Sequence, residues 1–230
     1  MTDTLSILLF VRTPEKGRVK SRLAADLGDE MALVIYKSFL LDILAMLRNG
    51  PHPFTLCVYP PDSGEALADW LGPSFTYVAQ EGNDLGEKMK NAFARSFSGG
   101  TEKAVLIGSD IPDLAIAVID EAFRSLDTCD AVIGPASDGG YYLIGFRRDR
   151  FLPGVFEGIL WGTESVFGKT LGLFHAADLS VHVLPQRHDI DTADDLQSLF
   201  ARNEHSAFRE SRTMSFIREN KEHILGHRFS

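Results

Sequence analysis

The sequence predicts an α/β fold of the Rossmann-like kind, a single three-layer α/β/α domain around a mostly parallel, mixed sheet. Short apolar runs rich in β-formers alternate with amphipathic helical patterns along most of the 230 residues. The alternation breaks after Ile133, where two strand-like runs are separated by Gly139 and Gly140 without room for a helix. Parallel strands need a long crossover, so the sheet is expected to become mixed at this point.

The individual elements follow from local pattern and boundary residues. Short apolar runs predict strands at 5–11, 54–59, 75–79, 104–107, 131–134, 141–146 and 181–184. Helical periodicity predicts helices at 30–47, 64–71, 85–97, 115–126, 165–177 and 193–202. No internal repeat or low-complexity tract interrupts this order, so we expect one catalytic domain over residues 1–203.

The segment 204–230 differs in charge from the body of the chain. From Arg202 onward, six Lys or Arg stand against four Asp or Glu. Phe216, Ile217, Ile224 and Leu225 lie roughly at helical spacing, which predicts an amphipathic helical extension. Such a helix would pack on the domain or on a second subunit, which would make a homodimer; the alternative is a frayed tail.

Composition excludes several classes of function. A net charge of -9 disfavours a nucleic-acid partner, because binding along a phosphate backbone needs broad positive potential. No apolar run approaches a membrane span and the start lacks a basic signal region, so a cytoplasmic protein is expected. Cys57 and Cys129 have no partners at zinc-site or disulfide-framework spacing.

A cluster of five cations interrupts this acidic background directly after the first predicted strand. Arg12, Lys16, Arg18, Lys20 and Arg22 fall within eleven residues, with Gly17 among them. A loop between a strand and a helix is a common phosphate site, because backbone N–H groups and basic side chains both favour an anion. The alternative interpretation is a solvated surface loop.

An acid follows the fourth predicted strand, in the run from Gly108 to Asp113. Ligands of open α/β sheets bind beyond the carboxyl ends of the strands, which is where Asp110 and Ser109 are expected. Asp113 is the better placed cap for the next helix, so Asp110 is left for Mg²⁺ or Mn²⁺, which take one or two protein carboxylates.

A second acidic cluster follows the last predicted strand. In extended backbone, Asp189 and Asp191 point to one face, so two carboxylates would share one site. Thr192 and Asp195 form a capping-box pattern, which is the structural explanation for that pair but does not account for the two acids before it.

Glycine-rich segments supply further candidates. Asp138, Gly139, Gly140 and Tyr141 predict either a pocket floored by backbone or a plain turn, and Trp161 resembles them as an aromatic beside a small residue.

The loop before residue 85 contains Gly82, whose backbone would approach a nucleobase or ribose, and Asp84, which with Glu87 also forms a capping box. G-x-S-x-G and a dinucleotide G-x-G-x-x-G after the first strand are both absent from the sequence, which disfavours hydrolases of that type and conventional NAD enzymes.

Taken in order, five motifs resemble an uncharacterised bacterial glycosyltransferase-like family. They are Pro14-x-x-Gly17-x-x-Lys20-Ser21-Arg22-Leu23, Asp84-Leu85-Gly86, Gly108-Ser109-Asp110-x-Pro112, Asp138-Gly139-Gly140-Tyr141-Tyr142 and Asp189-x-Asp191-Thr192. The family belongs to the nucleotide-diphospho-sugar transferase superfamily, with the glycosyltransferase-A-type fold, and is similar to the phospholactate and molybdenum-cofactor guanylyltransferases.

The resemblance implies that Lys20 and Arg22 hold nucleotide phosphates and that Asp110 and Asp191 hold the metal, with Asp189 as an auxiliary ligand. Nucleotidyltransferases of this superfamily usually open with a glycine-rich loop, whereas this chain offers Gly17 alone there. A nucleotide-sugar glycosyltransferase with a small-molecule acceptor is therefore expected, with nucleotidyl transfer from a nucleoside triphosphate as the alternative. A catalytically silent nucleotide-binding protein is the alternative of another class.

Overall fold

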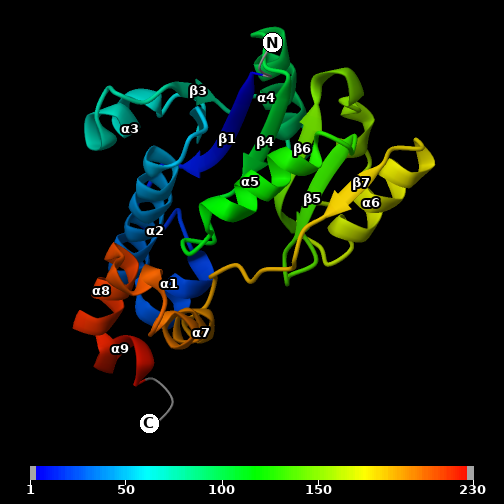
Figure 1. Cartoon of the computed structure of the whole chain (residues 1–230). Helices are drawn as coiled ribbons and strands as arrows, with labels where there is room; N and C mark the ends of the chain where they lie inside the picture. Colours follow the sequence, from blue (N-terminus) through cyan, green and yellow to red (C-terminus); the bar gives the residue numbers. More distant parts are fainter. Residues whose placement is uncertain (1–3, 227–230) are drawn as a thin grey trace. The chain divides into compact units, whose positions relative to one another are not determined.

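The computed structural model describes residues 4–226 and divides into two compact units (Figure 1). The first unit comprises residues 4–13, 50–108 and 115–187. The second comprises residues 14–49, 109–114 and 188–226. Each unit is therefore built from three separate stretches of the chain.

The first unit, in its described part, holds a seven-stranded sheet in the order β3-β2-β1-β4-β6-β5-β7. The strands are β1 (Leu5–Arg12), β2 (Phe54–Tyr59), β3 (Tyr77–Ala79), β4 (Lys103–Ile107), β5 (Ala131–Pro135), β6 (Tyr141–Arg147) and β7 (Val181–Val183). β6 pairs antiparallel with β4 and β5, whereas every other pair is parallel. The expected mixed α/β sheet is confirmed, and its change of direction falls at Gly139 and Gly140.

Helices cover both faces of this sheet. They are α3 (Gly64–Leu71), α4 (Leu85–Ser98), α5 (Ile116–Ser125) and α6 (Val166–Ala176), with short 3₁₀ turns η1 (Arg148–Arg150) and η2 (Pro153–Phe156). β2 and α3 begin and end at the predicted residues, and other elements shift by one or two. β3 is two residues shorter than expected, and the Phe75 ring just before it packs against Phe54 and Tyr77.

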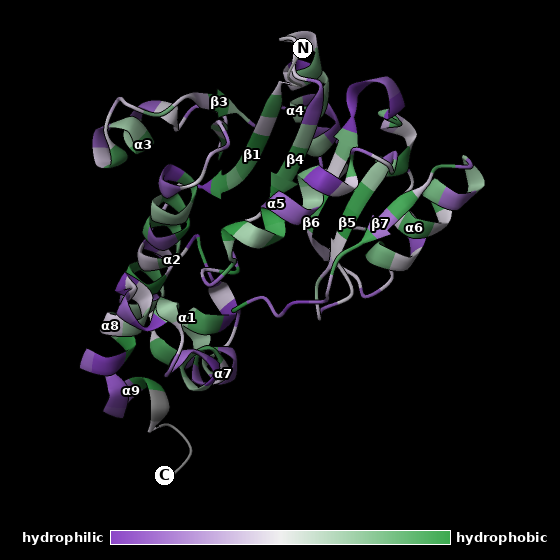
Figure 2. Cartoon of the chain, viewed as in Figure 1, coloured by the Kyte–Doolittle hydropathy of each residue, from purple (hydrophilic) through white to green (hydrophobic). Residues whose placement is uncertain are grey.

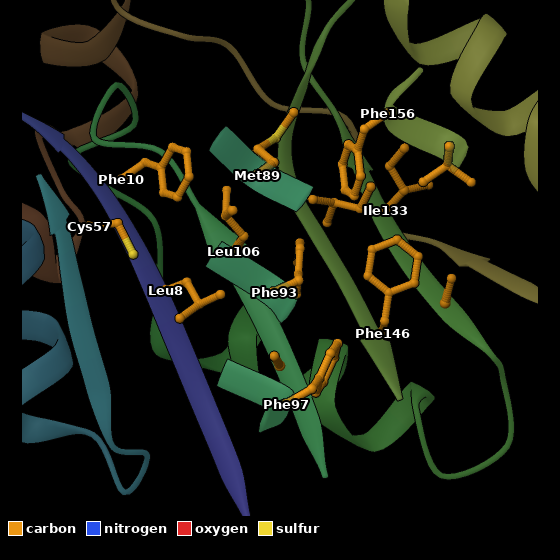
Figure 3. Close-up of a cluster of buried hydrophobic side chains, with 14 of the residues drawn as sticks. Leu8, Phe10, Cys57, Met89, Phe93, Phe97, Leu106, Ile133, Phe146 and Phe156 are labelled. Atoms are coloured by element: carbon orange, nitrogen blue, oxygen red, sulfur yellow. The ribbon is translucent and has the colours of Figure 1, made fainter. Parts of the chain in front are cut away.

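An aromatic cluster forms the core on one face of the sheet. Phe93 of α4 packs against Phe97 of the same helix, Phe146 of β6 and Phe156 of η2, and Leu8 and Leu106 of the strands belong to the same cluster (Figure 3). The ring centroids of Phe93 and Phe146 are 5.1 Å apart and edge to face, a favoured aromatic geometry. α5 packs on β4 and β5 from outside this cluster, on the opposite face. Figure 2 shows the corresponding concentration of hydrophobic residues in β1, β4 and β5.

The close packing at Gly86 leads to a stability prediction. A Cβ atom at Gly86, within α4, would lie 2.5 Å from the Phe156 carbonyl oxygen and 2.7 Å from the Trp161 ring. Gly86→Ala is expected to destabilise the protein by about 1–3 kcal/mol, since an added methyl in a packed site forces its surroundings apart.

Gly168→Ala in α6 is the matched control, because its Cβ would meet nothing within 4 Å. It should stabilise by about 0.5–1 kcal/mol, the ordinary gain of Ala over Gly inside a helix. Urea unfolding of both variants measures the difference. If Gly86→Ala is as stable as the wild type, the Phe156 carbonyl and the Trp161 ring can move aside without cost.

The second unit is a helical assembly with its own core. Its elements are α1 (Ser21–Leu27), α2 (Asp29–Asn49), α7 (Ala193–Asn203), η3 (Ala207–Glu210), α8 (Arg212–Glu219) and α9 (Lys221–Leu225). Leu23, Phe39 and Leu196 share a buried cluster with Ile217 and Ile224. The helical extension expected after residue 203 is thus present, and within the described residues it packs on helices of its own unit. The domain boundary at 203 and the homodimer stay predictions.

Two local expectations are wrong in the second unit. The run of five cations, expected to lie in a loop, ends inside the seven-residue helix α1, which includes Arg22 and whose Leu23 and Leu27 are buried. Asp113 does not cap the helix that follows it, since α5 starts after Ala115 without a side-chain cap. Instead, the Asp113 carboxylate accepts hydrogen bonds from Arg202 Nε at 2.9 Å and from Asn203 Nδ2 at 2.8 Å. Tertiary pairing has displaced the local capping role.

The Asp113 pair predicts a pH effect. Burial alone would raise the pKa of the Asp113 carboxyl, but hydrogen bonds from Arg202 and Asn203 outweigh it and hold the pKa below its ordinary value. A lowered folded-state pKa means that the stabilisation is present above about pH 4 and is lost as pH falls through the folded value.

Asp113→Asn should therefore cost about 1–2 kcal/mol at pH 7, allowing for the partial exposure of Arg202, and less at pH 3. Unfolding curves at both pH values measure this, with the exposed Asp69 changed to Asn as control. An equal loss at both pH values would contradict the ion-pair explanation.

Within residues 4–226, no helix combines the length and apolar character required to cross a membrane.

Candidate active site around Lys20

Two acids predicted for the site are brought together within the second unit. The Ile190 backbone N–H donates to the Asp110 carbonyl oxygen at 3.0 Å, which joins the segment 109–114 to the segment that begins at residue 188. Ile111 and Ile190 are buried and hold the two segments in place. Asp110 and Asp191, which flank this junction, are therefore neighbours although they are far apart in sequence.

The start of α7 fixes Asp191 from the other side. The Asp195 carboxylate accepts hydrogen bonds from the backbone N–H groups of Asp191 at 3.0 Å and Thr192 at 2.9 Å. Thr192 is the N-cap, and the predicted capping box with Asp195 is confirmed. Asp26 of α1 accepts from the Ala193 N–H at 3.1 Å and ties α7 to α1. The Asp191 side chain is left to point elsewhere.

The Lys20 ammonium lies between the two carboxylates. Its Nζ forms ion pairs with Asp110 Oδ1 and, at 2.9 Å, with Asp191 Oδ1. The Lys20 side chain is 4% exposed, whereas those of Asp110 and Asp191 are 47% and 38% exposed. The carboxylates therefore separate the ammonium from solvent and present their outer surfaces to it.

The backbone at Lys20 is strained to achieve this position. Lys20 is the N-cap of α1 and adopts the left-handed conformation, with φ 49° and ψ 53°. Such a conformation is uncommon for a residue other than Gly and costs about 1 kcal/mol or more. Burial alone would lower the pKa of the Lys20 ammonium, but Asp110 and Asp191 outweigh it and raise the pKa above its ordinary value. Lys20 is thus a protonated, buried cation.

The other cations of the predicted phosphate loop lie nearer the solvent. Arg22 Nη1 is 3.9 Å from Asp191 Oδ2 and its side chain is 74% exposed, so much of its guanidinium faces outward. Lys16 pairs with Glu30, and Arg18 Nε lies 3.5 Å from Glu15 Oε2. Gly17 adopts a positive φ of 73°, which turns the loop tightly there.

Two residues of α2 complete the surroundings, and the sequence did not reveal them. The Phe39 ring centroid is 5.8 Å from Lys20 Nζ, and the Tyr36 hydroxyl lies 3.3 Å from the Ser109 hydroxyl. Both aromatic side chains and Ser109 are buried. The helical spacing of Tyr36 and Phe39 predicts a core face, but nothing in it indicates contact with a lysine at the start of α1.

The acidic pair suits a divalent cation that also binds a phosphorylated ligand. Mg²⁺ usually takes one or two protein carboxylates and completes its coordination with waters and substrate phosphates, which matches two half-exposed carboxylates. Within residues 4–226, no group of three or more acidic, His or Cys side chains lies close enough to hold a metal. Asp189 therefore does not join Asp110 and Asp191 in a three-acid cluster, and its auxiliary role stays a prediction.

Several predicted nucleotide-binding residues belong to the first unit. Arg12 ends β1, and its guanidinium carbon lies 5.2 Å from the centroid of the Tyr59 ring. Asp84 caps α4 by accepting from the Glu87 N–H at 2.8 Å, which is one half of the predicted capping box, whereas the Glu87 carboxylate accepts from the Asn83 N–H at 2.8 Å. Gly82 has a φ of 140°, and a Cβ there would lie 2.6 Å from that of Glu87. Local structure explains Asp84 and Gly82, and their role toward a nucleotide stays a prediction.

The predicted acceptor residues also lie in the first unit. Asp138 accepts from the Gly140 N–H at 2.9 Å, and Ala136 donates to the Gly140 carbonyl oxygen at 3.0 Å, which is a hairpin turn. The Tyr141 hydroxyl lies 3.8 Å from the Met89 sulfur, and its ring meets Trp161 edge to face at 6.3 Å.

Gly139 has a positive φ of 89°, and its carbonyl oxygen accepts from the Phe167 N–H at 2.8 Å. The turn interpretation of the 138–140 segment therefore holds. Acceptor binding by this segment or by Trp161 remains a prediction.

The fold is that of known nucleotide-diphospho-sugar transferase-like structures. A crystal structure from Desulfovibrio desulfuricans G20, which carries the provisional name nucleotide-diphospho-sugar transferase, is 42% identical, with a TM-score of 0.95. The similarity covers 98% of this chain and 99% of that one. A family model described as "Uncharacterized protein conserved in bacteria (DUF2064)" matches residues 40–163. The chain belongs to that family.

More distant structures share the fold. A cytidylyltransferase from Leptospira borgpetersenii serovar Hardjo-bovis (strain JB197) has a TM-score of 0.55 at 15% identity, covering 97% of each chain. A CMP:2-keto-3-deoxy-manno-octonic acid synthetase in complex with CTP has a TM-score of 0.52 at 9% identity, covering 87% of this chain and 98% of that one. No curated protein matches this chain.

Proposed function

We propose that this protein is a Mg²⁺-dependent transferase that uses a nucleotide-activated donor. The observation that carries the proposal is the pair of half-exposed carboxylates, Asp110 and Asp191, fixed side by side by Lys20 and by the junction of two chain segments. Family membership supports a nucleotide-dependent reaction, since the relative at 42% identity is named for a nucleotide-diphospho-sugar substrate. The distant relatives named for cytidylyl transfer and CTP binding share its fold.

Each part of the site has a distinct role in this proposal. Asp110 and Asp191 would hold Mg²⁺ or Mn²⁺, which when bound neutralises charge on the phosphates of the leaving group. Arg22 extends into solvent beside Asp191, and we expect its planar fork to bind a phosphate oxygen. Lys20 in this arrangement already contacts both acids, so its main part is to hold them.

Within this class, we propose a nucleotide-sugar donor and transfer of the sugar to a small-molecule acceptor. The tight loop at Gly17 carries one glycine, and Lys16 and Arg18 are paired with Glu30 and Glu15. A triphosphate donor requires more phosphate-binding groups than a diphosphate, and this loop offers few that are not already paired. Nucleotidyl transfer, in which an acceptor phosphate displaces pyrophosphate, is the second candidate because the fold relatives carry such names.

A thermal-shift panel tests the proposal without knowledge of the acceptor. Nucleoside triphosphates and nucleotide sugars are added with Mg²⁺ or with chelator to the wild-type protein and to Asp110→Asn. A ligand at one hundred times its Kd stabilises by about 2.7 kcal/mol, which raises Tm by roughly 5–10 °C for a chain of this length.

A metal-dependent shift with one nucleotide, lost in Asp110→Asn, supports the proposal and identifies the donor. A shift that persists with chelator and in Asp110→Asn indicates a metal-independent nucleotide-binding protein instead. The absence of a shift with every nucleotide would contradict both.

A further inference from the structure

We infer that Lys20 is a built-in counter-cation that keeps a divalent metal from binding the two acids until a nucleotide brings compensating negative charge. The inference rests on the proposed function, in which Asp110 and Asp191 hold the metal. It makes Lys20 a positioning residue, which acts through the acids rather than on the phosphates. Metal and donor would then enter together, as the metal–nucleotide complex.

The first ground is the charge of the cluster. The carboxylates of Asp110 and Asp191 contribute two negative charges, and the Lys20 ammonium pairs with both. The Arg22 guanidinium stands 3.9 Å from the outer oxygen of Asp191 and adds a second positive charge. Two acids and two bases leave the cluster neutral. Metal affinity in proteins rises with the negative charge of the ligands, so a neutral cluster is a weak site for a bare dication.

The second ground is that the Lys20 ammonium cannot readily move away from the carboxylates of Asp110 and Asp191. Its side chain is 4% exposed, beneath the carboxylates, with the Phe39 ring 5.8 Å from the ammonium. An ammonium moved away from both carboxylates into such surroundings would lose its partners without gaining water. The ammonium charge therefore stays close to any metal that the outer carboxylate oxygens bind, and it repels that metal. The repulsion is weakly screened, because the ammonium is buried.

The third ground is the strain at this residue. Lys20 occupies the left-handed region, where a glycine would be free of penalty, yet a lysine stands there. Observed strain of this kind is kept where a side chain has a function at that position. The interaction that the lysine gains in return is the double ion pair.

The nucleotide changes this balance. Two or three phosphate groups carry several negative charges, which reach the cluster from the solvent side, where the carboxylates and Arg22 are exposed. The added negative charge compensates the metal and leaves the Lys20 pair in place. The metal affinity of the protein is therefore expected to be low alone and high with the nucleotide.

The test is a Mn²⁺ titration of the nucleotide-free protein, in which electron paramagnetic resonance measures the concentration of free Mn²⁺. Lys20→Met removes the counter-cation and should bind Mn²⁺ at least about tenfold more tightly than the wild type, because the cluster then carries a net negative charge. Lys20→Gln is a second neutral variant. Lys20→Arg keeps the charge and should bind Mn²⁺ as weakly as the wild type. Near-UV circular dichroism verifies the fold of each variant.

Equal Mn²⁺ affinities in the wild type, Lys20→Met and Lys20→Gln would overturn the inference and leave the proposed metal site intact. Tight Mn²⁺ binding by the wild-type protein alone, with Kd below about 0.1 mM, would overturn it without any variant. A different result marks failure of the proposed function: neither the wild type nor any variant binds Mn²⁺, alone or with CTP, GTP or UDP-glucose. The gain in Lys20→Met should also disappear when Asp191→Asn is added.

Discussion

Replacing Asp110 by Asn is expected to lower the rate of the transfer reaction by about 1,000-fold, with the fold intact. The metal would hold the charge that develops on the leaving group, and removing one such stabilising interaction typically costs two to three orders of magnitude in turnover. Asp191→Asn should have a similar effect, because both carboxylates flank the same junction and both contact Lys20.

The assay uses the donor found by the thermal-shift panel and follows release of the nucleoside diphosphate or of pyrophosphate. Asp69→Asn on α3 is the matched control, an exposed acid of the first unit whose change should leave turnover unaltered. Far-UV circular dichroism confirms that the variants are folded. If both acid variants keep turnover within threefold of the wild type, the acids have no part in the reaction.

Replacing Lys20 by Met is expected to lower the free energy of unfolding by about 2–4 kcal/mol. Removing one partner of a buried ion pair leaves the other charge unpaired, and here two carboxylates would face each other without the ammonium that lies between them. The half-exposed acids regain some water, which keeps the loss at the lower end of the range for buried pairs. Lys20→Arg should lose less, because it retains the charge.

A double-mutant cycle separates the ion pairs from packing. If repulsion between the acids causes the loss, Asp191→Asn in the Lys20→Met background should restore part of the stability. Millimolar Mg²⁺ should also stabilise Lys20→Met more than the wild type, since the metal replaces the missing positive charge. Urea unfolding supplies all of these values. Purely additive losses would show that Lys20 acts by packing alone.

The sequence predicted the sheet well because its signals are local. The apolar run of β2 and the amphipathic pattern of α3 determine those elements almost alone, and both match at each end. The mixed sheet followed from the short spacing around Gly139 and Gly140. α1 was missed because its seven residues are too few to show a clear helical period, and they follow a run of cations. The helix depends on Leu23 and Leu27, which are buried in the core of the second unit.

The candidate site was predictable in part. The rule that ligands bind beyond strand ends singled out Asp110 and Asp191, and the structure places both against Lys20, 171 residues from Asp191 in sequence. The buried position of Lys20 was not predictable, because it depends on Phe39, on the left-handed backbone and on tertiary contacts. The predicted capping role of Asp113 was wrong for the same reason, because Arg202 and Asn203, which bind its carboxylate, come from a helix distant in sequence.

The most direct test of the metal-dependent transferase is a crystal structure with Mn²⁺ and the nucleotide selected by the thermal-shift panel. Anomalous scattering locates the metal independently of the protein atoms. The proposal predicts one Mn²⁺ at about 2.0–2.3 Å from a carboxylate oxygen of Asp110 and of Asp191, with a nucleotide phosphate oxygen completing its coordination. A bound nucleotide with both carboxylates still engaged by Lys20 alone, and the metal absent or held elsewhere, would contradict it.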